Sequence, residues 1–362
     1  MQEIILEKLK DYKIPILDIP FIDRVEEIIQ ILDWTERARA WTYVIYGPWG
    51  CGKSELMRAL THVTNKIEKY YTIYINLAKE QREEIIKTRD RDLKEIIKII
   101  SETAGTLGRI IELAYEFIRE LAKKLKLYKK HLILIIDEAH RGALRRVEII
   151  PSILEEELRK AIQDIEVEKI SIILTTSEQT YVERIMKNEG KYITTLLTWN
   201  LDKTHAENLA QTLGISQNET KKIVEICDSS PRLIIDYKII YRENIELLIG
   251  DLIDKVTTAI IEYIRKTEKT KEETIKELET YIENIDEIEY TKIYNTLLKH
   301  NIIIKLTQKT ITKIPQEEHI GKRIAYQLKT YKKIIETITK QKTINITPKQ
   351  VLKHFHTTPQ KK

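Results

Sequence analysis

Residues 42–54 read Thr-Tyr-Val-Ile-Tyr-Gly-Pro-Trp-Gly-Cys-Gly-Lys-Ser and contain the pattern G-x-x-x-x-G-K-[ST]. The chain has only 10 glycines, yet three of them fall within six positions here. Glycines let consecutive backbone N–H groups curl around phosphate oxygens, and a helix that follows directs its positive end at the same anion. The β-branched and aromatic residues before Gly47 predict a buried strand, and the residues after Ser54 have helical spacing. The stretch therefore predicts a phosphate-binding loop between a strand and a helix.

The positions of this loop have distinct expected roles. Lys53 is expected to reach the β- and γ-phosphates of a nucleotide, and the hydroxyl of Ser54 is expected to bind Mg²⁺. ATP and Mg²⁺ are thus the predicted cofactors. The residues predicted to hold the nucleotide are Gly47, Pro48, Trp49, Gly50, Cys51, Gly52, Lys53, Ser54 and Glu55.

A second apolar run, at residues 132–136, ends in Asp137 and Glu138. A continuously apolar strand is typical of the centre of a parallel sheet that is covered on both faces. Asp137 follows this strand at the edge where open α/β sheets bind ligands, so it is predicted to hold the Mg²⁺. Glu138 is predicted to polarise the attacking water as general base. An ordinary strand that happens to end in two acidic residues is the alternative, and the nearby phosphate loop argues against it.

Two further polar positions are candidates for the same site. Thr175 and Thr176 end a third apolar run that begins at Ile170, where their hydroxyls could sense a γ-phosphate. Arg232 follows a proline that favours the start of a helix, so it is expected to project from a helix N-terminus. From the residues alone, threonines chosen for β-propensity and a solvated arginine remain open as alternatives.

Length and composition limit the class of protein. The chain has 362 residues with 42% hydrophobic content, which predicts a folded protein of two or three domains. No apolar run approaches the ~18 residues of a membrane span, and the N-terminal residues lack an uninterrupted apolar stretch. Two distant cysteines support neither a disulfide framework nor a metal site. We therefore expect a cytoplasmic protein without membrane contact. A charged content of 32% fits a thermophile, although an AT-rich genome would also favour Ile and Lys.

Positive charge is concentrated near the end of the chain. Residues 299–362 contain 15 Lys and Arg against 3 Asp and Glu, a local charge of +12 that suggests a polyanionic partner. A helix over 289–300 followed by two short strands, 302–306 and 310–314, predicts a winged helix. A winged helix that only packs against protein is the alternative. The lysines expected to contact DNA phosphates are Lys292, Lys299, Lys305, Lys309 and Lys313.

The order of these motifs resembles the AAA+ class, and more closely the archaeal ATPases related to the signal-transduction (STAND) NTPases. Residues 21–27 resemble the motif Phe-x-Gly-Arg-x-x-Glu, with Asp23 in place of Gly. The resemblance covers residues 15–240. It implies a helical lid after residue 200, with Arg232 as the lid arginine that contacts the γ-phosphate, and Thr175 or Thr176 as the polar sensor. It also suggests that Asn76 restrains Glu138 until a partner binds.

These observations predict an α/β P-loop NTPase (AAA+-like) with a parallel-sheet core, a lid and a winged helix. The predicted function is a switch ATPase that couples its nucleotide state to duplex DNA or a protein partner, with homo-oligomers possible. A replication-initiator ATPase of the archaeal origin-binding type and a non-catalytic, nucleotide-bound scaffold are the alternatives. The predicted domains are an ATPase core at 1–200, a lid at 201–265, a winged helix at 266–320 and a basic tail at 321–362.

Overall fold

The computed structural model describes residues 2–15, 17–78, 86–88, 92–103, 114–127, 129–141, 167–187 and 193–356. The chain divides into two compact units. Unit 1 comprises Met1–Gly47, Lys53–Thr198 and Lys309–Thr312, and unit 2 comprises Pro48–Gly52, Trp199–Gln308 and Lys313–Lys362. Within the described ranges, no helix has the length and apolarity needed to cross a membrane.

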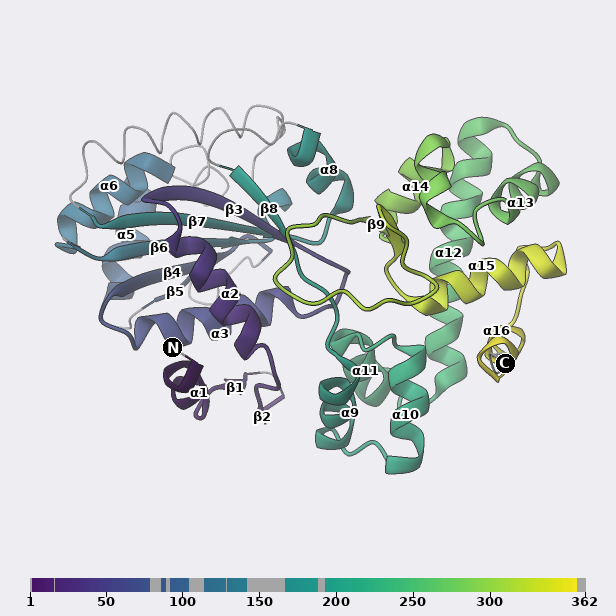
Figure 1. The fold of residues 1–362 in the computed structure, drawn as a ribbon, viewed down its shortest axis with the longest axis horizontal. Helices are drawn as coiled ribbons and strands as arrows, with labels where there is room; N and C mark the ends of the chain where they lie inside the picture. The colour runs from purple at the N-terminus through teal and green to yellow at the C-terminus, as the bar shows by residue number, and fades with distance from the viewer. Residues whose placement is uncertain are drawn as a thin grey trace. The chain divides into compact units, whose positions relative to one another are not determined.

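Unit 1 contains a six-stranded sheet with the order β5-β4-β6-β7-β3-β8 (Figure 1). All neighbouring pairs are parallel except β4 and β5 at one edge. Strand β7 lies between β3 and β6, so the strands that precede the phosphate loop and Asp137 are two strand spacings apart, about 10 Å. The strands are β3 (Ala40–Tyr46), β4 (Tyr70–Asn76), β5 (Ile86–Lys87), β6 (His131–Asp137), β7 (Lys169–Thr176) and β8 (Ile193–Leu197).

Alternating side chains of these strands build a core on each face of the sheet. On β6, Leu132, Leu134 and Ile136 pack into one cluster, while Ile133 and Ile135 pack into the other. Because both faces are covered, the strand is apolar at every position, as predicted. Helices α5 (Leu93–Thr103), α6 (Ala114–Lys124) and α8 (Gln179–Lys187) cover the first face, and α1 (Gln2–Leu9), α2 (Val25–Glu36) and α3 (Lys53–Asn65) the second. Ile96, Ile99 and Ile100 recur at helical spacing on α5 and are buried in the first cluster.

Two small elements accompany this core. The strands β1 (Lys13–Ile14) and β2 (Ile19–Pro20) form an antiparallel pair before α2. At the start of α2, Arg24 and Glu27 form a buried ion pair of 2.7 Å, which uses the arginine and the acid of the Phe21–Glu27 motif. The Phe21–Glu27 motif therefore has a local structural role at the start of α2.

The single-turn helix η3 (Ala139–Arg141) follows β6.

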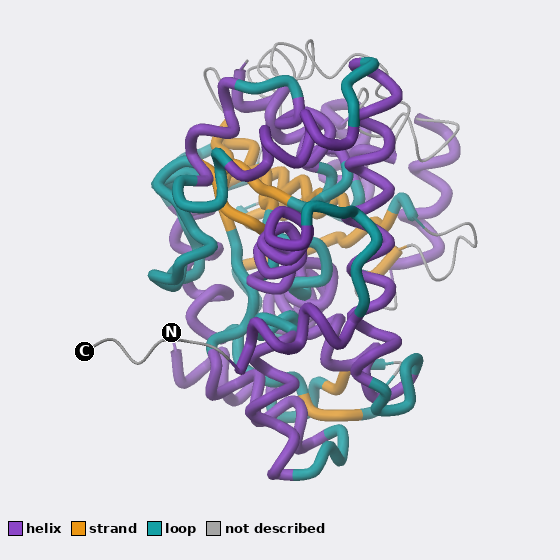
Figure 2. Tube along the Cα trace, turned by 90° about the vertical axis from the view of Figure 1, so that its right-hand side faces the viewer, coloured by secondary structure: helices purple, strands orange, loops and turns teal. Residues whose placement is uncertain are grey.

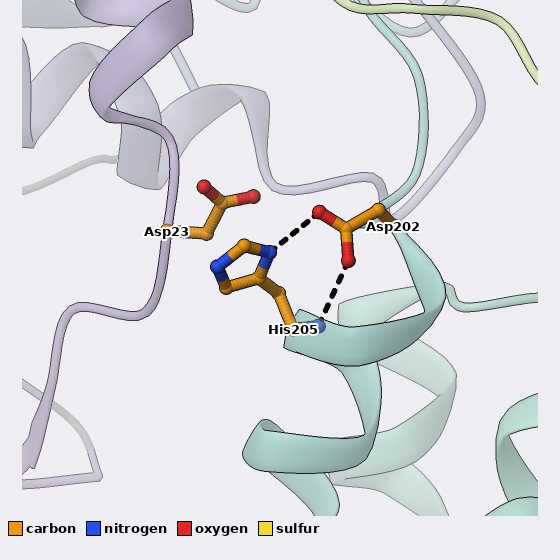
Figure 3. A group of neighbouring side chains, drawn as sticks. All are labelled: Asp23, Asp202 and His205. Atoms are coloured by element: carbon orange, nitrogen blue, oxygen red, sulfur yellow. Dashed lines mark hydrogen bonds and ion pairs between the residues drawn. The ribbon is translucent and has the colours of Figure 1, made fainter.

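Unit 2 begins with three short helices. Asp202 caps the first of them, because its carboxylate accepts the backbone N–H of His205 at 3.0 Å and lies 2.5 Å from the His205 Nδ1 (Figure 3). The helices are α9 (Lys203–Thr212), α10 (Gln217–Ile226) and α11 (Pro231–Ile239), with Pro231 in the first turn of α11. Helices therefore follow residue 200, and their role as a lid stays a prediction.

The rest of unit 2 packs around one long helix, and helices predominate in this part of the chain (Figure 2). The long helix α12 (Ile245–Thr267) contacts the helices α14, α15 and α16. It ends where Glu268 adopts a left-handed conformation, and Thr270 opens α13 with a capping box. The remaining elements are α13 (Lys271–Glu279), η5 (Ile285–Tyr290), α14 (Ile293–Lys299), β9 (Ile303–Lys305), β10 (Ile324–Tyr326), α15 (Lys329–Gln341) and α16 (Pro348–His356).

The predicted hairpin between 302–306 and 310–314 is wrong. Strand β9 pairs instead with β10, and residues 310–314 form no strand with it. Thr310 makes a parallel bridge with Leu197 at the edge of the unit 1 sheet, where the N–H of Leu197 donates to Lys309 O at 2.9 Å. The buried side chain of Ile311 joins the core of unit 1. Residues 309–311 provide hydrogen-bond partners for the backbone groups at the open edge of β8. This pairing is more favourable than the hairpin that the local alternation of apolar and polar residues predicted.

Residues 324–356, predicted within a basic tail, form β10, α15 and α16. The apolar positions Tyr331, Ile334, Ile335 and Ile338 recur at helical spacing on α15 and are buried. Several lysines of α15 lie in ion pairs: Lys329 contacts Glu225 at 3.2 Å, and Lys333 contacts Glu318 at 2.9 Å. The positive charge of this segment is therefore partly neutralised within the fold.

Candidate nucleotide-binding site

The loop after β3 has the backbone that its glycines predict. Gly50 and Gly52 have φ values of +81° and +92°, a region that favours glycine. Helix α3 begins at Lys53, whose buried ammonium donates to the carbonyl of Gly47 at 3.1 Å. Ser54 lies in the first turn of the same helix, and Glu55 pairs with Arg58 at 2.7 Å. The loop thus combines a curled backbone, a helix N-terminus and a cation.

The opposite side of the candidate site is the end of β6. Asp137 is 1% exposed, and its carboxylate accepts hydrogen bonds from Tyr74 at 2.6 Å and from Thr175. Asn76 donates to the same carboxylate at 3.4 Å. Burial, followed by the charge of Asp137, raises the pKa of Tyr74 well above its usual range, so this phenol remains a donor. These hydrogen bonds hold a buried carboxylate at the carboxyl edge of the sheet.

Glu138 follows Asp137 in a left-handed conformation with φ 55°. This conformation costs a non-glycine residue about 1 kcal/mol and turns the chain sharply after the strand. The Glu138 carboxylate lies 3.5 Å from His140 Nε2 and 3.9 Å from Arg141 Nε. Burial lowers the pKa of His140, although the charge of Glu138 opposes the shift. Asn76 donates to Asp137 and Tyr74, so the suggested restraint of Glu138 by Asn76 is not a contact in this structure.

The tip of the loop, Pro48–Gly52, belongs to unit 2 and contacts α11. The N–H of Arg232 donates to Gly50 O at 3.2 Å. A Cβ added to Gly50 would lie 2.6 Å from the Cβ of Arg232, so only glycine fits against the helix here. The Arg232 guanidinium is held by Asp236, with 2.8 Å between Nε and Oδ2, and its side chain is 55% exposed. Arg232 therefore projects from the helix N-terminus, as expected.

Three residues in these contacts were missed by sequence reasoning. Tyr74 positions Asp137, Asp236 positions Arg232, and Gln327 accepts the N–H of Trp49 at 2.7 Å. The i,i+4 spacing of Arg232 and Asp236 on a predicted helix was a usable signal. Tyr74 and Gln327 carried none, because their partners are distant in the sequence.

The residues present fit a nucleotide with a divalent cation. The positive φ values of Gly50 and Gly52 give the loop the curl that a phosphate needs, and the donors beside it are a hydroxyl and a carboxylate, which Mg²⁺ prefers. Ser54 and Asp137 are the residues that would hold the cation, and Thr175 lies on the strand between them. Thr176 instead contacts His140 at 3.0 Å, which favours Thr175 as the residue nearest the carboxylate.

The sheet order and the two motifs at its carboxyl edge define an AAA+-like P-loop ATPase fold. Residues 21–237 match the family model described as an ATPase domain predominantly from Archaea, and the chain belongs to this family.

The similarity to two other proteins extends beyond residues 21–237 of this chain. An ATP-binding protein of Methanocaldococcus jannaschii is 25% identical over 340 residues, which cover 80% of this chain and 91% of that protein. The structure of a Walker-type ATPase of Pyrococcus abyssi matches with a TM-score of 0.51 and 15% identity, covering 88% of this chain and 96% of the other. At this identity the structural match supports the fold alone.

Proposed function

We propose that this protein binds and hydrolyses ATP, and that its nucleotide state controls the binding of duplex DNA or a partner by its C-terminal elements. The observation that carries the first part is the meeting of three motifs at one sheet edge. The phosphate loop follows β3, Thr175 ends β7, and Asp137 with Glu138 ends β6, in adjacent positions of the sheet. The family membership supports the same reaction class.

The residues of the chain divide the chemistry between them. The loop amides and Lys53 bind and orient the phosphates, while Tyr74 and Thr175 fix the Asp137 carboxylate. A bound Mg²⁺ would supply charge neutralisation at the phosphates. Glu138 would accept the proton of the attacking water. Burial lowers the pKa of His140, whose Nε2 lies 3.5 Å from the Glu138 carboxylate.

The coupling is supported by the two backbone hydrogen bonds of the loop tip. Gly50 O accepts from Arg232 of α11, and Trp49 N donates to Gln327, which directly follows β10. Gln327 also donates to Ile303 O of β9 at 3.1 Å. A loop that changes shape on binding phosphate must change these contacts, which gives the two nucleotide states different interactions with the C-terminal elements.

For DNA, we propose a basic surface formed by Lys292 and Lys322 beside the exposed ring of Tyr290. Tyr290 is 72% exposed, and the Arg323 guanidinium lies 5.2 Å from its ring centroid. Lys292 and Lys322 are exposed and have no ion pair with any described residue. By contrast, Lys299 pairs with Glu262 and Lys305 with Glu289, so these two predicted contacts are already neutralised. Arg323 also pairs with Glu289, at 2.9 Å, and is neutralised in the same way. The winged-helix and tail boundaries stay predictions.

The double variant Lys292→Ala/Lys322→Ala is expected to weaken duplex binding. Each phosphate contact contributes a slope of about −0.9 in log K against log salt, so the variant slope should be smaller by roughly 2. Titration of a labelled duplex at several salt concentrations measures this. Lys203→Ala, an exposed lysine on α9, is the control and should leave the slope unchanged. Equal slopes for all three proteins would reject the basic surface as the DNA interface.

Gly50→Ala is expected to weaken ATP binding by at least about tenfold. Alanine pays about 1–2 kcal/mol at a positive φ, and its Cβ would collide with that of Arg232. Isothermal titration with a non-hydrolysable ATP analogue measures the loss. Gly250→Ala is the matched control, because a Cβ there meets nothing within 4 Å. If both variants bind as the wild type does, the loop is not the nucleotide site.

A further inference from the structure

Lys255 of α12 lies beside the tip of the phosphate loop. Its Nζ is 5.4 Å from the ring centroid of Trp49 and 5.2 Å from that of Tyr331 on α15. Trp49 is the third residue of the loop, and its N–H is held by Gln327. All four residues belong to unit 2. A lysine far along the chain therefore lies close to one aromatic ring of the phosphate loop and to one ring of α15.

This lysine lacks the carboxylate partner that its neighbours have. Among the described residues, Lys255 makes no hydrogen bond or ion pair, whereas Lys266 of the same helix contacts Glu262 at 2.6 Å. Its burial lowers its pKa to about 8, so the ammonium is poorly stabilised where it lies. Aromatic rings attract a cation, but they do not replace a counter-ion.

A second cation converges on the same ring. The guanidinium carbon of Arg232 lies 5.9 Å from the Trp49 centroid. Two positive groups beside one indole repel each other unless an anion lies near both. Asp236 binds the Nε of Arg232 but makes no contact with Lys255. Two cations therefore lie beside the Trp49 ring with only one carboxylate among the described residues, Asp236, to balance them. A phosphate bound at this loop would supply a second negative group.

We propose that Lys255, together with Arg232, binds the terminal phosphate of the nucleoside triphosphate held by residues 47–54. The inference rests on the proposed function and adds to it a residue outside the matched family domain, which ends at residue 237. Going from ADP to ATP adds negative charge at this end of the nucleotide. An under-stabilised ammonium gains most from that charge, so Lys255 would help the protein distinguish ATP from ADP.

The test compares nucleotide affinities of Lys255→Met, Lys255→Arg and the wild type at pH 7. We expect Lys255→Met to weaken a non-hydrolysable ATP analogue about tenfold or more and ADP less than threefold. Lys255→Arg should restore most of the affinity for the analogue. Lys276→Met, on an exposed lysine of α13, controls for the loss of one positive charge.

A pH series provides a readout that a structural role would not change. In the wild type the preference for the ATP analogue should fall from pH 7 to pH 9, as an ammonium with a pKa of about 8 loses its proton. The neighbouring groups are Arg232, Asp236, Tyr241, Asp251 and Tyr331, and burial raises the pKa of both tyrosines above this range. Lys255→Arg should therefore keep its preference up to pH 9.

The outcomes separate the inference from the function on which it rests. A wild type that binds neither nucleotide overturns the proposed function. A wild type that binds both, with Lys255→Met weakening them equally or not at all, overturns only the role of Lys255. If Lys255→Met lost affinity for duplex DNA but kept its nucleotide affinity, the anion beside Lys255 would be a DNA phosphate. That outcome would also overturn the proposed role of Lys255. If Lys255→Met does not fold, the pH series of Lys255→Arg decides.

Discussion

Glu138→Gln is expected to reduce ATP turnover by about 10²- to 10⁴-fold while leaving ATP binding within a factor of about three. The amide keeps the size of the side chain and its left-handed backbone position, but it cannot accept the proton of the attacking water. Lys53, which is expected to bind the phosphates, and Asp137, which is expected to hold Mg²⁺, keep all their contacts. Steady-state phosphate release, together with analogue binding by titration, measures the two effects separately.

Glu272→Gln is the matched control, because Glu272 is exposed on α13 and makes no hydrogen bond or ion pair with any described residue. It should hydrolyse ATP at the wild-type rate. Equal turnover in Glu138→Gln and the wild type would remove Glu138 as general base. Negligible turnover in the wild type itself, with tight binding, would instead support the alternative of a nucleotide-bound scaffold.

Asp286→Ala is expected to lower the free energy of unfolding of unit 2 by about 2–3 kcal/mol. The Asp286 carboxylate accepts the backbone N–H groups of Lys322, Arg323 and Ile324, each at 2.8 Å. These bonds tie η5 to the start of β10, and alanine leaves all three donors without this acceptor. Urea denaturation measures the change, and a melting temperature should fall by about 4–10 °C.

The effect of Asp286 depends on pH in a defined direction. Partial burial opposes ionisation, but the three backbone N–H groups and the charge of Arg323 lower its pKa below the usual value. For a carboxyl group with a lowered pKa in the folded state, the stabilisation is complete above its unfolded pKa of about 3.9. It is lost as the pH falls through the lower folded value. The difference between wild type and Asp286→Ala should therefore be constant from pH 5 to 7 and shrink below pH 4.

Asp254→Ala, at an exposed position of α12, is the control and should change stability by less than about 0.5 kcal/mol. A pH-independent loss in Asp286→Ala would mean that the carboxylate acts through packing and not through its charge. The surface around η5 carries two of the lysines proposed for DNA binding. Weakened duplex binding by Asp286→Ala would therefore be interpretable only where the variant remains folded.

The core of the site could be predicted from short stretches of sequence. The phosphate loop, the apolar strands at 132–136 and 170–174, and the acidic pair after β6 are all confirmed as structure, because each depends on neighbouring residues. Left-handed glycines, continuous apolar strands and helical spacing act over a few positions of the chain. Their roles in binding and hydrolysis stay predictions until the variants above are measured.

The pairing of β9 could not be predicted in the same way. Residues 310–314 alternate as a strand should, yet Thr310 lies at the edge of β8 and β9 pairs with β10, more than ten residues further along.

The lysines of 299–342 also appeared in the sequence as one block of positive charge. Ion pairs with Glu262, Glu289 and Glu318 neutralise several of them, which only the folded chain reveals.

The sequence alone determined the chemistry of the loop and the class of fold, because those properties follow from local backbone sterics and from side-chain periodicity. Tertiary structure decided which residues surround that loop. Gln327, Lys255 and Arg232 reach it from three separate parts of unit 2, and Tyr74 reaches Asp137 from a neighbouring strand. The physical reason is that hydrogen bonds and charge interactions depend on distance in space, and residues hundreds of positions apart in the chain meet only after the helices have packed.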